Sequence, residues 1–172
     1  EYLRWPARHR DERIREDRAY GIFAAVSPDG VDWRPLPQPL LVHPSDTDTT
    51  VLWDAGIERY VMYTRMMREG RRWIGRAESE DFRRWGPVQP VVWPRLDDPP
   101  DHDFYLNGYT RYHGLPEYQL MFPMVYIRYT ERSEVRLFSS VDGVAWNQVP
   151  GGPVIEPGAP GDVARAAGAR IV

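Results

Sequence analysis

The sequence contains no cysteine and no lysine, and all 22 of its basic residues are arginine. The absence of cysteine excludes disulfides, thiolate nucleophiles and cysteine-ligated zinc, and it leaves the compartment open between cytoplasm and secretion. The absence of lysine excludes a phosphate-binding loop of the Gly-Lys-Ser/Thr kind, Schiff-base chemistry and a catalytic amine. The groups left for chemistry are carboxylates, four histidines, arginine and aromatic rings, a set that suits sugars better than nucleotides.

Long apolar runs and a strong net charge are also missing. No stretch approaches the roughly 18 uninterrupted apolar residues of a membrane helix, so no membrane partner is predicted. A net charge of −3 gives no electrostatic case for nucleic acid. The 172 residues, of which 42% are hydrophobic and 13% aromatic, fit a single globular domain. No cofactor is predicted, and the oligomeric state stays open.

A short pattern recurs three times in the sequence: a serine, an aspartate two residues later, and a tryptophan six residues after the serine. It occupies residues 27–33, 79–85 and 140–146, so that the tryptophans lie 52 and 61 residues apart. An apolar segment that contains proline follows each tryptophan, at residues 37–42, 89–93 and 152–155. Spacing of this length predicts a repeated structural unit.

Strand signals fill the sequence between these patterns. In one period they cover residues 49–54, 58–65, 72–77 and the segment after Trp85, and in the next 104–112, 118–126, 134–139 and the segment near Val154. No window has convincing helical periodicity, and the charged residues 8–18 are the only helical candidate. Four short strands per period with a recurring tryptophan are typical of a β-propeller blade. We predict an all-β propeller of four-stranded antiparallel blades, in which the aspartate caps each turn and the tryptophan packs between blades.

The predicted blades do not complete a ring. Residues 20–162 read as a partial propeller, with the outer half of one blade at 20–42 and whole blades at about 46–96 and 101–156. A charged segment (1–19) precedes them and a tail (163–172) follows. Because propellers close with about four to eight blades, two and a half blades lead us to expect a fragment of a longer propeller or a truncated product. The first residue is Glu1, so the absence of a leader peptide is uninformative.

Acidic residues precede the first predicted strand of each blade, the strand that lines the channel of a propeller. Asp48 and Asp103 are 55 residues apart, close to the tryptophan spacing, and we expect them at matching positions that converge near the axis. Two carboxylates about 5–5.5 Å apart, or about 6.5–9.5 Å apart, carry out retaining or inverting glycoside hydrolysis. The other interpretation is that these aspartates cap turns at the blade entrances.

Further side chains are candidates for sugar contact. Arginine forks onto carboxylates or hydroxyls, aromatic rings stack on sugars, and acidic residues accept hydroxyl protons. Surface ion pairs and core packing are the competing roles for these residues. The binding candidates are Asp46, Trp53, Arg65, Tyr105, Arg111, Glu156 and Asp162.

Histidines near the acidic residues raise the question of a metal site, which would combine them with Asp101 and Asp103. His102 lies between these aspartates, and an extended backbone turns it to the opposite face. A shared site would need ligands from elsewhere, so no metal is predicted from His43, His102 and His113.

The runs DTDTTVLWD (46–54), RYVMYTR (59–65) and SVDGVAW (140–146) resemble the five-bladed propeller glycosidases. These are glycoside hydrolase families 32, 43, 62 and 68, and the resemblance is strongest to uncharacterised family-32-like bacterial members. The resemblance covers about residues 20–162, and it consists only of a similar pattern of strand and turn residues. It implies furanoside or fructoside substrates, with an aspartate nucleophile or base, an aspartate stabiliser and a glutamate acid on successive blades.

The motifs of family 32, an Asn-Asp-Pro-Asn box, a Glu-Cys pair and an Arg-Asp-Pro triplet, are absent. By blade position, the resemblance assigns Asp48 as nucleophile or base and Asp103 as stabiliser of the transition state. No residue matches the glutamate acid, so the chain is expected to be an enzyme only as part of a complete protein. Three alternatives stay open: a non-catalytic carbohydrate-binding or interaction propeller, a glycoside phosphorylase, and a sialidase-like group whose turn box resembles the recurring pattern.

Overall fold

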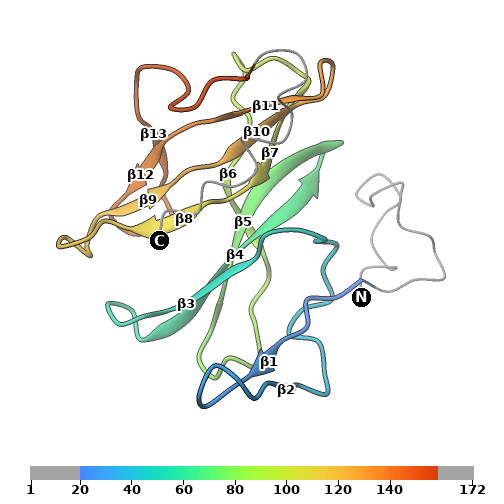
Figure 1. Cartoon of the computed structure of the whole chain (residues 1–172), viewed down its shortest axis with the longest axis vertical. Coiled ribbons are helices and arrows are strands. Elements are labelled where there is room, and N and C mark those ends of the chain that lie inside the picture. The colour runs from blue at the N-terminus through green and yellow to red at the C-terminus, as the bar shows by residue number, and fades with distance from the viewer. Residues whose placement is uncertain (1–19, 159–172) are drawn as a thin grey trace.

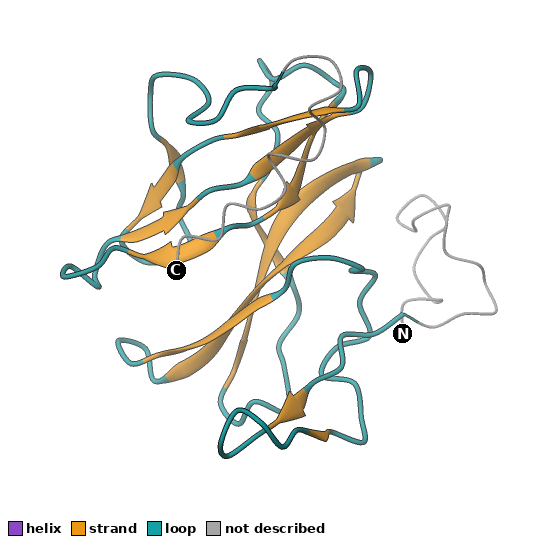
Figure 2. Ribbon diagram, in the orientation of Figure 1, coloured by secondary structure: helices purple, strands orange, loops and turns teal. Residues whose placement is uncertain are grey.

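The computed structural model describes residues 20–158, and every regular element in that range is a β-strand (Figures 1 and 2). The all-β prediction is therefore confirmed for this part of the chain. No helix among these residues is long and apolar enough to cross a bilayer. The helical candidate at 8–18 lies outside the described residues.

The strands form four antiparallel groups. β1 (Ala25–Val26) pairs with β2 (Arg34–Pro35) in a two-stranded sheet. The central sheet has the order β3-β4-β5-β6, a second four-stranded sheet has the order β13-β12-β9-β8, and a three-stranded sheet has the order β11-β10-β7. None of these sheets closes on itself in the described range. In Figure 1 the small sheet lies at one end of the long axis, the central sheet in the middle, and β7–β13 at the other end.

The central sheet follows the sequence in simple order. Its strands are β3 (Thr50–Asp54), β4 (Arg59–Arg68), β5 (Arg71–Ser79) and β6 (Gln89–Val92). β4 and β5 make the longest hairpin, in which Tyr60 faces Ser79 and Arg68 faces Arg71. Its two-residue turn places Glu69 at φ 54° and Gly70 at φ 71°, the left-handed pair that suits the twist of a hairpin.

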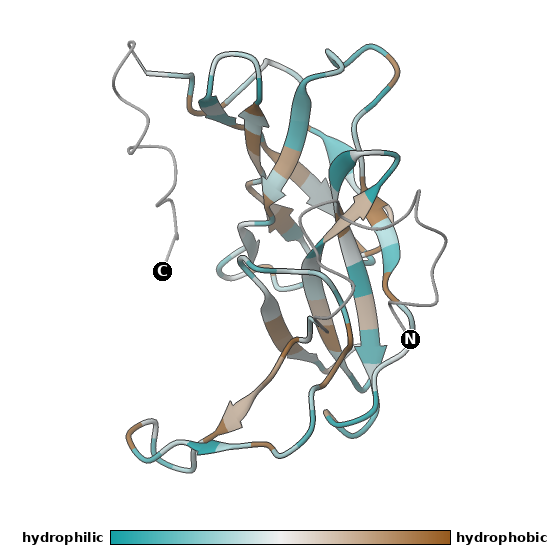
Figure 3. Cartoon of the chain, turned by 90° about the vertical axis from the view of Figure 1, so that its right-hand side faces the viewer, coloured by the Kyte–Doolittle hydropathy of each residue, from teal (hydrophilic) through white to brown (hydrophobic). Residues whose placement is uncertain are grey.

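Both faces of the central sheet are covered. Val61 and Tyr63 on β4 point into a cluster that includes Phe104 and Met121 from the later strands. Met62, between them, points to the other face and packs in a second cluster with Leu40. Hydrophobic and hydrophilic bands accordingly alternate along the strands in Figure 3. Because successive side chains of a strand point to opposite faces, β4 joins the two halves of the core.

The later strands are more broken than predicted. The expected strand at 104–112 is divided into β7 (His102–Leu106) and β8 (Tyr109–Arg111), which belong to different sheets. Gly108 separates them at φ 54°, a conformation that glycine adopts without the penalty of a Cβ atom.

The next two predicted strands are divided in the same way. The strand at 118–126 becomes β9 (Gln119–Met121) and β10 (Met124–Ile127), separated at Pro123, which has no N–H for a ladder. The strand at 134–139 becomes β11 (Arg132–Val135) and β12 (Phe138–Ser140), and β12 also pairs with β13 (Asn147–Gln148). Near Val154, a single bridge between Ile155 and Val135 replaces the expected strand.

The three recurring patterns form turns with the same hydrogen bonds. In the third turn (140–146), Asp142 Oδ1 accepts the backbone N–H groups of Val144 and Ala145, both at 2.8 Å. The indole N–H of Trp146 donates to the Gly143 carbonyl at 3.0 Å. The first turn (27–33) and the second turn (79–85) have equivalent bonds. The predicted capping role of the aspartate is therefore confirmed.

Trp146 packs between separate sheets, whereas Trp33 of the first turn is 60% exposed. The Trp146 ring lies edge-on to Tyr63 of the central sheet, with 5.9 Å between ring centroids, and edge-on to Tyr109 of β8 at 6.2 Å. The Tyr63 hydroxyl donates to the Gly143 carbonyl at 2.8 Å. The third turn therefore fastens the second four-stranded sheet to the central one.

Candidate functional site

Asp48 lies where the approach to β3 meets the approach to β8. It is partly buried, and its Oδ2 accepts backbone N–H groups from Asn107 at 3.3 Å and Gly108 at 3.5 Å. Neutral backbone donors orient the carboxylate without neutralising it. Asp48 thus presents an oriented, partly accessible negative charge just before β3, an edge strand of the central sheet.

Asn107 is the residue that joins these two segments. Its Oδ1 accepts the Thr50 hydroxyl and the Tyr109 backbone N–H, both at 3.0 Å, and its Nδ2 donates to the Asp48 carbonyl at 3.1 Å. The side chain is 2% exposed, so these bonds take the place of solvent. Sequence analysis missed this residue, although a signal exists: Asn107 precedes β8 by two residues, as Asp48 precedes β3.

The structure places Asp103 differently from expectation. Asp103 lies inside β7, opposite Tyr126 of β10, and it is Asn107 that takes the position matching Asp48. The Asp103 side chain is 0% exposed. The spacing of 55 residues therefore reflects the period of the sequence and not equivalent places beside strands.

Two arginines surround the Asp103 carboxylate. Arg72 of β5 donates its backbone N–H to Oδ1 at 3.2 Å and Nη1 to Oδ2 at 2.7 Å. Arg128 approaches Oδ2 with Nε at 3.6 Å. The Asp103 carboxylate is thus enclosed and held by these two arginines.

Asp46, Arg65 and Tyr105, three of the predicted binding residues, do come together. Arg65 is 3% exposed, forms an ion pair with the exposed Asp46, and lies over the Tyr105 ring at 4.5 Å. The Arg72 guanidinium lies over the same ring at 5.1 Å. This contact connects Asp46 to the surroundings of Asp103. We use the name inner-edge cluster for Asp46, Asp48, Arg65, Arg72, Asp103 and Tyr105.

Trp53 and Arg111 lie at the opposite ends of their strands from this cluster. Arg111 pairs with Asp54 at 3.1 Å and donates Nε to the Tyr109 hydroxyl at 3.3 Å. The hydrogen bond to Tyr109 is the main cause that raises the pKa of Arg111. Trp53 is 47% exposed and lies edge-on to Tyr60. The two predicted residues therefore belong to a separate region.

The last two binding candidates are Glu156 and Asp162. Glu156 is exposed and follows the bridge at Ile155, while Asp162 lies outside the described residues.

Two of the histidines, His43 and His102, make structural contacts. His43 is 4% exposed and donates Nε2 to the Arg65 carbonyl at 2.7 Å, and burial lowers its pKa. His102 Nδ1 accepts from Arg136 Nη2 at 3.1 Å. Within residues 20–158 no group of three or more histidines and carboxylates is arranged to hold a metal ion.

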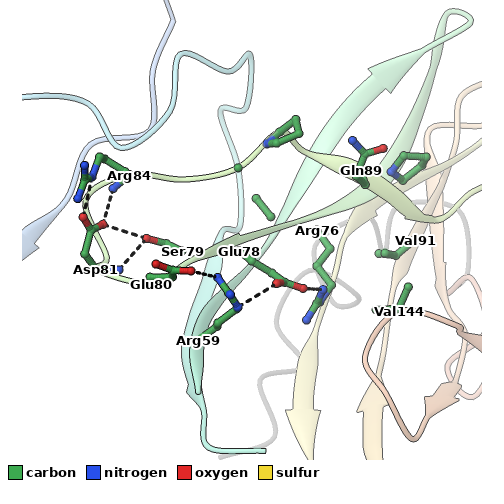
Figure 4. A pocket seen from close by; sticks show the side chains of 14 residues that line it. Arg59, Arg76, Glu78, Ser79, Glu80, Asp81, Arg84, Gln89, Val91 and Val144 are labelled. Carbon is green, nitrogen blue, oxygen red and sulfur yellow. Dashed lines mark hydrogen bonds and ion pairs between the residues drawn. The ribbon is translucent and has the colours of Figure 1, made fainter. Parts of the chain in front are cut away.

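A cavity of about 750 Å³ lies elsewhere, between the central sheet and the third turn (Figure 4). We call it the lateral cavity. β5 and β6 form one wall, the second turn forms another, and Val144 closes it from the third turn. None of the predicted site residues lines it. The inner-edge cluster offers an oriented carboxylate and the lateral cavity offers volume, so we treat them as separate sites.

Comparisons with known proteins give the fold a context. No protein-family model matches the chain, and no curated protein matches it. Among solved structures, an N-acetylgalactosamine deacetylase from F. plautii in complex with blood group B trisaccharide is 16% identical, with a TM-score of 0.56 over 81% of this chain and 43% of that one.

Two further structures are similar. A glycoside hydrolase is 20% identical, with a TM-score of 0.57 over 73% of this chain and 41% of its own. A complex described as BT0996 and RGII is 21% identical, with a TM-score of 0.53 over the same shares. The chain thus spans less than half the length of these structures. At these identities the similarity shows a common fold, that of part of each of these proteins.

Proposed function

We propose that this chain is part of a five-bladed β-propeller protein that acts on a glycosidic bond of a carbohydrate. In this proposal the strands of the central sheet make one blade (about 46–96), those of β7–β13 make the next (about 101–156), and residues 20–42 belong to a third. Support comes from the fold shared with two carbohydrate-related structures, the F. plautii deacetylase with its trisaccharide and the glycoside hydrolase. The preference for furanoside or fructoside substrates in this proposal rests only on the similar pattern of strand and turn residues.

The observation that carries the proposal is the geometry of Asp48. Its carboxylate is held by two backbone N–H groups, is not ion-paired among the contacts of the described residues, and remains partly accessible. A reacting carboxylate in glycoside hydrolysis must be fixed in place and still reach the sugar. We assign Asp48 as nucleophile or base and Asp103 as a positioning residue that acts through Arg72 and Arg128. No general acid is assigned among residues 20–158.

The test uses the complete polypeptide that contains these residues, incubated with arabinofuranosides, fructans and sucrose. Asp48→Asn is expected to lower turnover by about a thousandfold or more, since the reacting oxygen is lost while the backbone donors retain an acceptor. Asp97→Asn is the matched control, because Asp97 is 85% exposed and has only one long ion pair, to Arg95. Turnover of a cleaved substrate that survives Asp48→Asn at the control level would contradict the assignment.

A carbohydrate-binding protein without catalysis is the second candidate. The observation that favours it is the complete burial of Asp103 between arginines, which removes one of the two carboxylates expected to react. In that case the complete protein would bind oligosaccharides without cleaving any. Asp48→Asn would then leave the dissociation constant unchanged within about twofold.

A further inference from the structure

We propose that the lateral cavity is a second carbohydrate site, one that binds a neutral saccharide independently of the inner-edge cluster. Its volume of about 750 Å³ falls within the range of about 300–1,000 Å³ that small-molecule pockets occupy. The cavity is lined by β5, β6 and Arg59 of β4, and none of its lining residues belongs to the inner-edge cluster. The inference does not depend on the proposed function of Asp48.

The charges that line the cavity are balanced. Arg76 pairs with Glu78, Arg59 with Glu80 at 2.8 Å, and Arg84 with Asp81 at 2.8 Å, so each cation already faces a carboxylate. Figure 4 shows Arg59, Glu78 and Arg76 joined in one row along the wall. The Arg59–Glu80 and Arg84–Asp81 pairs are largely exposed and cost little to break, but an anion bound at the enclosed Arg76 would have to displace Glu78. The balance therefore favours a neutral ligand.

The same groups suit hydroxyls. A sugar hydroxyl both donates and accepts, so neighbouring hydroxyls can bridge a guanidinium and a carboxylate without disturbing the pair. The Arg76 guanidinium is the most enclosed of the three, in a residue that is 7% exposed, and Gln89 adds an amide that donates and accepts. These planar polar groups can recognise vicinal diols.

Apolar atoms complete the lining. Val91 and Val144 face each other across one end of the cavity in Figure 4, and Pro87 and Pro90 line it as well. Aliphatic surface of this kind covers the C–H face of a pyranose or furanose ring. No aromatic ring among the described residues lines the cavity, so the stacking that strengthens many sugar sites is absent and we expect dissociation constants in the millimolar range.

The test is a titration of the ¹⁵N-labelled protein with cellobiose, sucrose and arabinobiose, with galacturonate and inorganic phosphate as charged probes. We expect amide shifts of residues 76–80, Gln89 and Val91 with neutral sugars and weaker shifts with the charged probes. Val144→Trp should fill the cavity and abolish these shifts. Val31→Trp, at the same position of the first turn, is the matched control, because Val31 is 78% exposed and lies outside the cavity.

Two more variants make the result decisive. Glu78→Gln keeps the shape of the side chain but removes one charged acceptor, so it should weaken binding of neutral sugars about tenfold. It provides the test if Val144→Trp fails to fold. Asp48→Asn should leave these shifts intact, which separates this site from the proposed function. The inference is overturned if neutral sugars shift no cavity residue, if Val144→Trp or Glu78→Gln binds like the control, or if a charged probe binds more tightly.

Discussion

Gly108 shows how one residue without a side chain determines the surroundings of Asp48. Its φ of 54° lets the backbone leave β7 and enter β8, and its N–H reaches the Asp48 carboxylate. A Cβ atom at this position would lie 2.4 Å from the Phe122 carbonyl oxygen, which is backbone and cannot swing away. Glycine is therefore needed here both for its conformation and for the close approach of two backbone segments.

A matched pair of alanine variants separates the two requirements. Gly114→Ala at φ 84° has nothing within 4 Å of its new Cβ, so it should lower the free energy of unfolding by about 1 kcal/mol through backbone strain alone. Gly108→Ala adds the collision and should cost about 1–3 kcal/mol more. Urea unfolding of both variants measures the difference. Equal losses would mean that the contact with Phe122 relaxes without cost.

Tyr63 illustrates why contacts between distant segments cannot be predicted from sequence. A tyrosine in a strand signal predicts a half-buried ring and nothing about its partners. In the structure its hydroxyl bonds to a carbonyl 80 residues away and its ring stacks on Tyr109 at 4.7 Å, while burial raises its pKa. Arg72 and Asp103 likewise meet across 31 residues. Such pairs depend on how sheets pack, which a single sequence does not encode locally.

Elements can be predicted where their signals are local. The aspartate-capped turns are predictable because each needs only seven consecutive residues, and the strands of the central sheet are predicted to within a few residues at their ends. The divisions within the later strands are not. Pro123 signals an edge or bulge, but Gly108 gives no sign that β7 and β8 join different sheets. Strand signals report the half-buried character of a segment and not which partner it pairs with.

The three turns predict a specific sensitivity to acid. The backbone N–H groups of Asp32 and Val31, and then the Ser27 hydroxyl, lower the pKa of Asp29 to about 2 from its ordinary value of 3.8. Backbone hydrogen bonds likewise lower the pKa of Asp81 and of Asp142. The stabilisation by a carboxylate with a lowered pKa is complete above its unfolded pKa and is lost as the pH falls through its folded pKa.

We therefore expect the unfolding free energy to decrease as the pH falls from about 4 toward 2. Asp142→Asn should flatten this decrease, since the third turn then has no carboxylate to protonate, whereas Asp97→Asn should not. Urea unfolding at a series of pH values tests both variants. An Asp142→Asn profile parallel to the wild type would show that the third turn does not contribute to acid sensitivity.

At the scale of the whole molecule, the three turns differ in how far other residues cover them. The third turn packs on the central sheet through Trp146, and the second turn packs with Leu36 and Leu40 through Phe82 and Trp85. The first turn has no such cover among the described residues: Val31 is 78% exposed and Trp33 is 60% exposed. Phe23, at 67% exposed, adds to the same end of the molecule.

Exposed apolar side chains gathered at one end favour association. We expect residues 1–172 alone to self-associate in proportion to concentration, and the double variant Phe23→Ser/Val31→Asp to reduce this. Tyr129→Ser is the control, because Tyr129 is 92% exposed but lies on the β10–β11 turn, away from the first turn. Light scattering over a concentration series compares the three proteins. The expectation is contradicted if the double variant scatters like the wild type while Tyr129→Ser scatters less. In that case the molecules associate through the β10–β11 turn and not through the first turn.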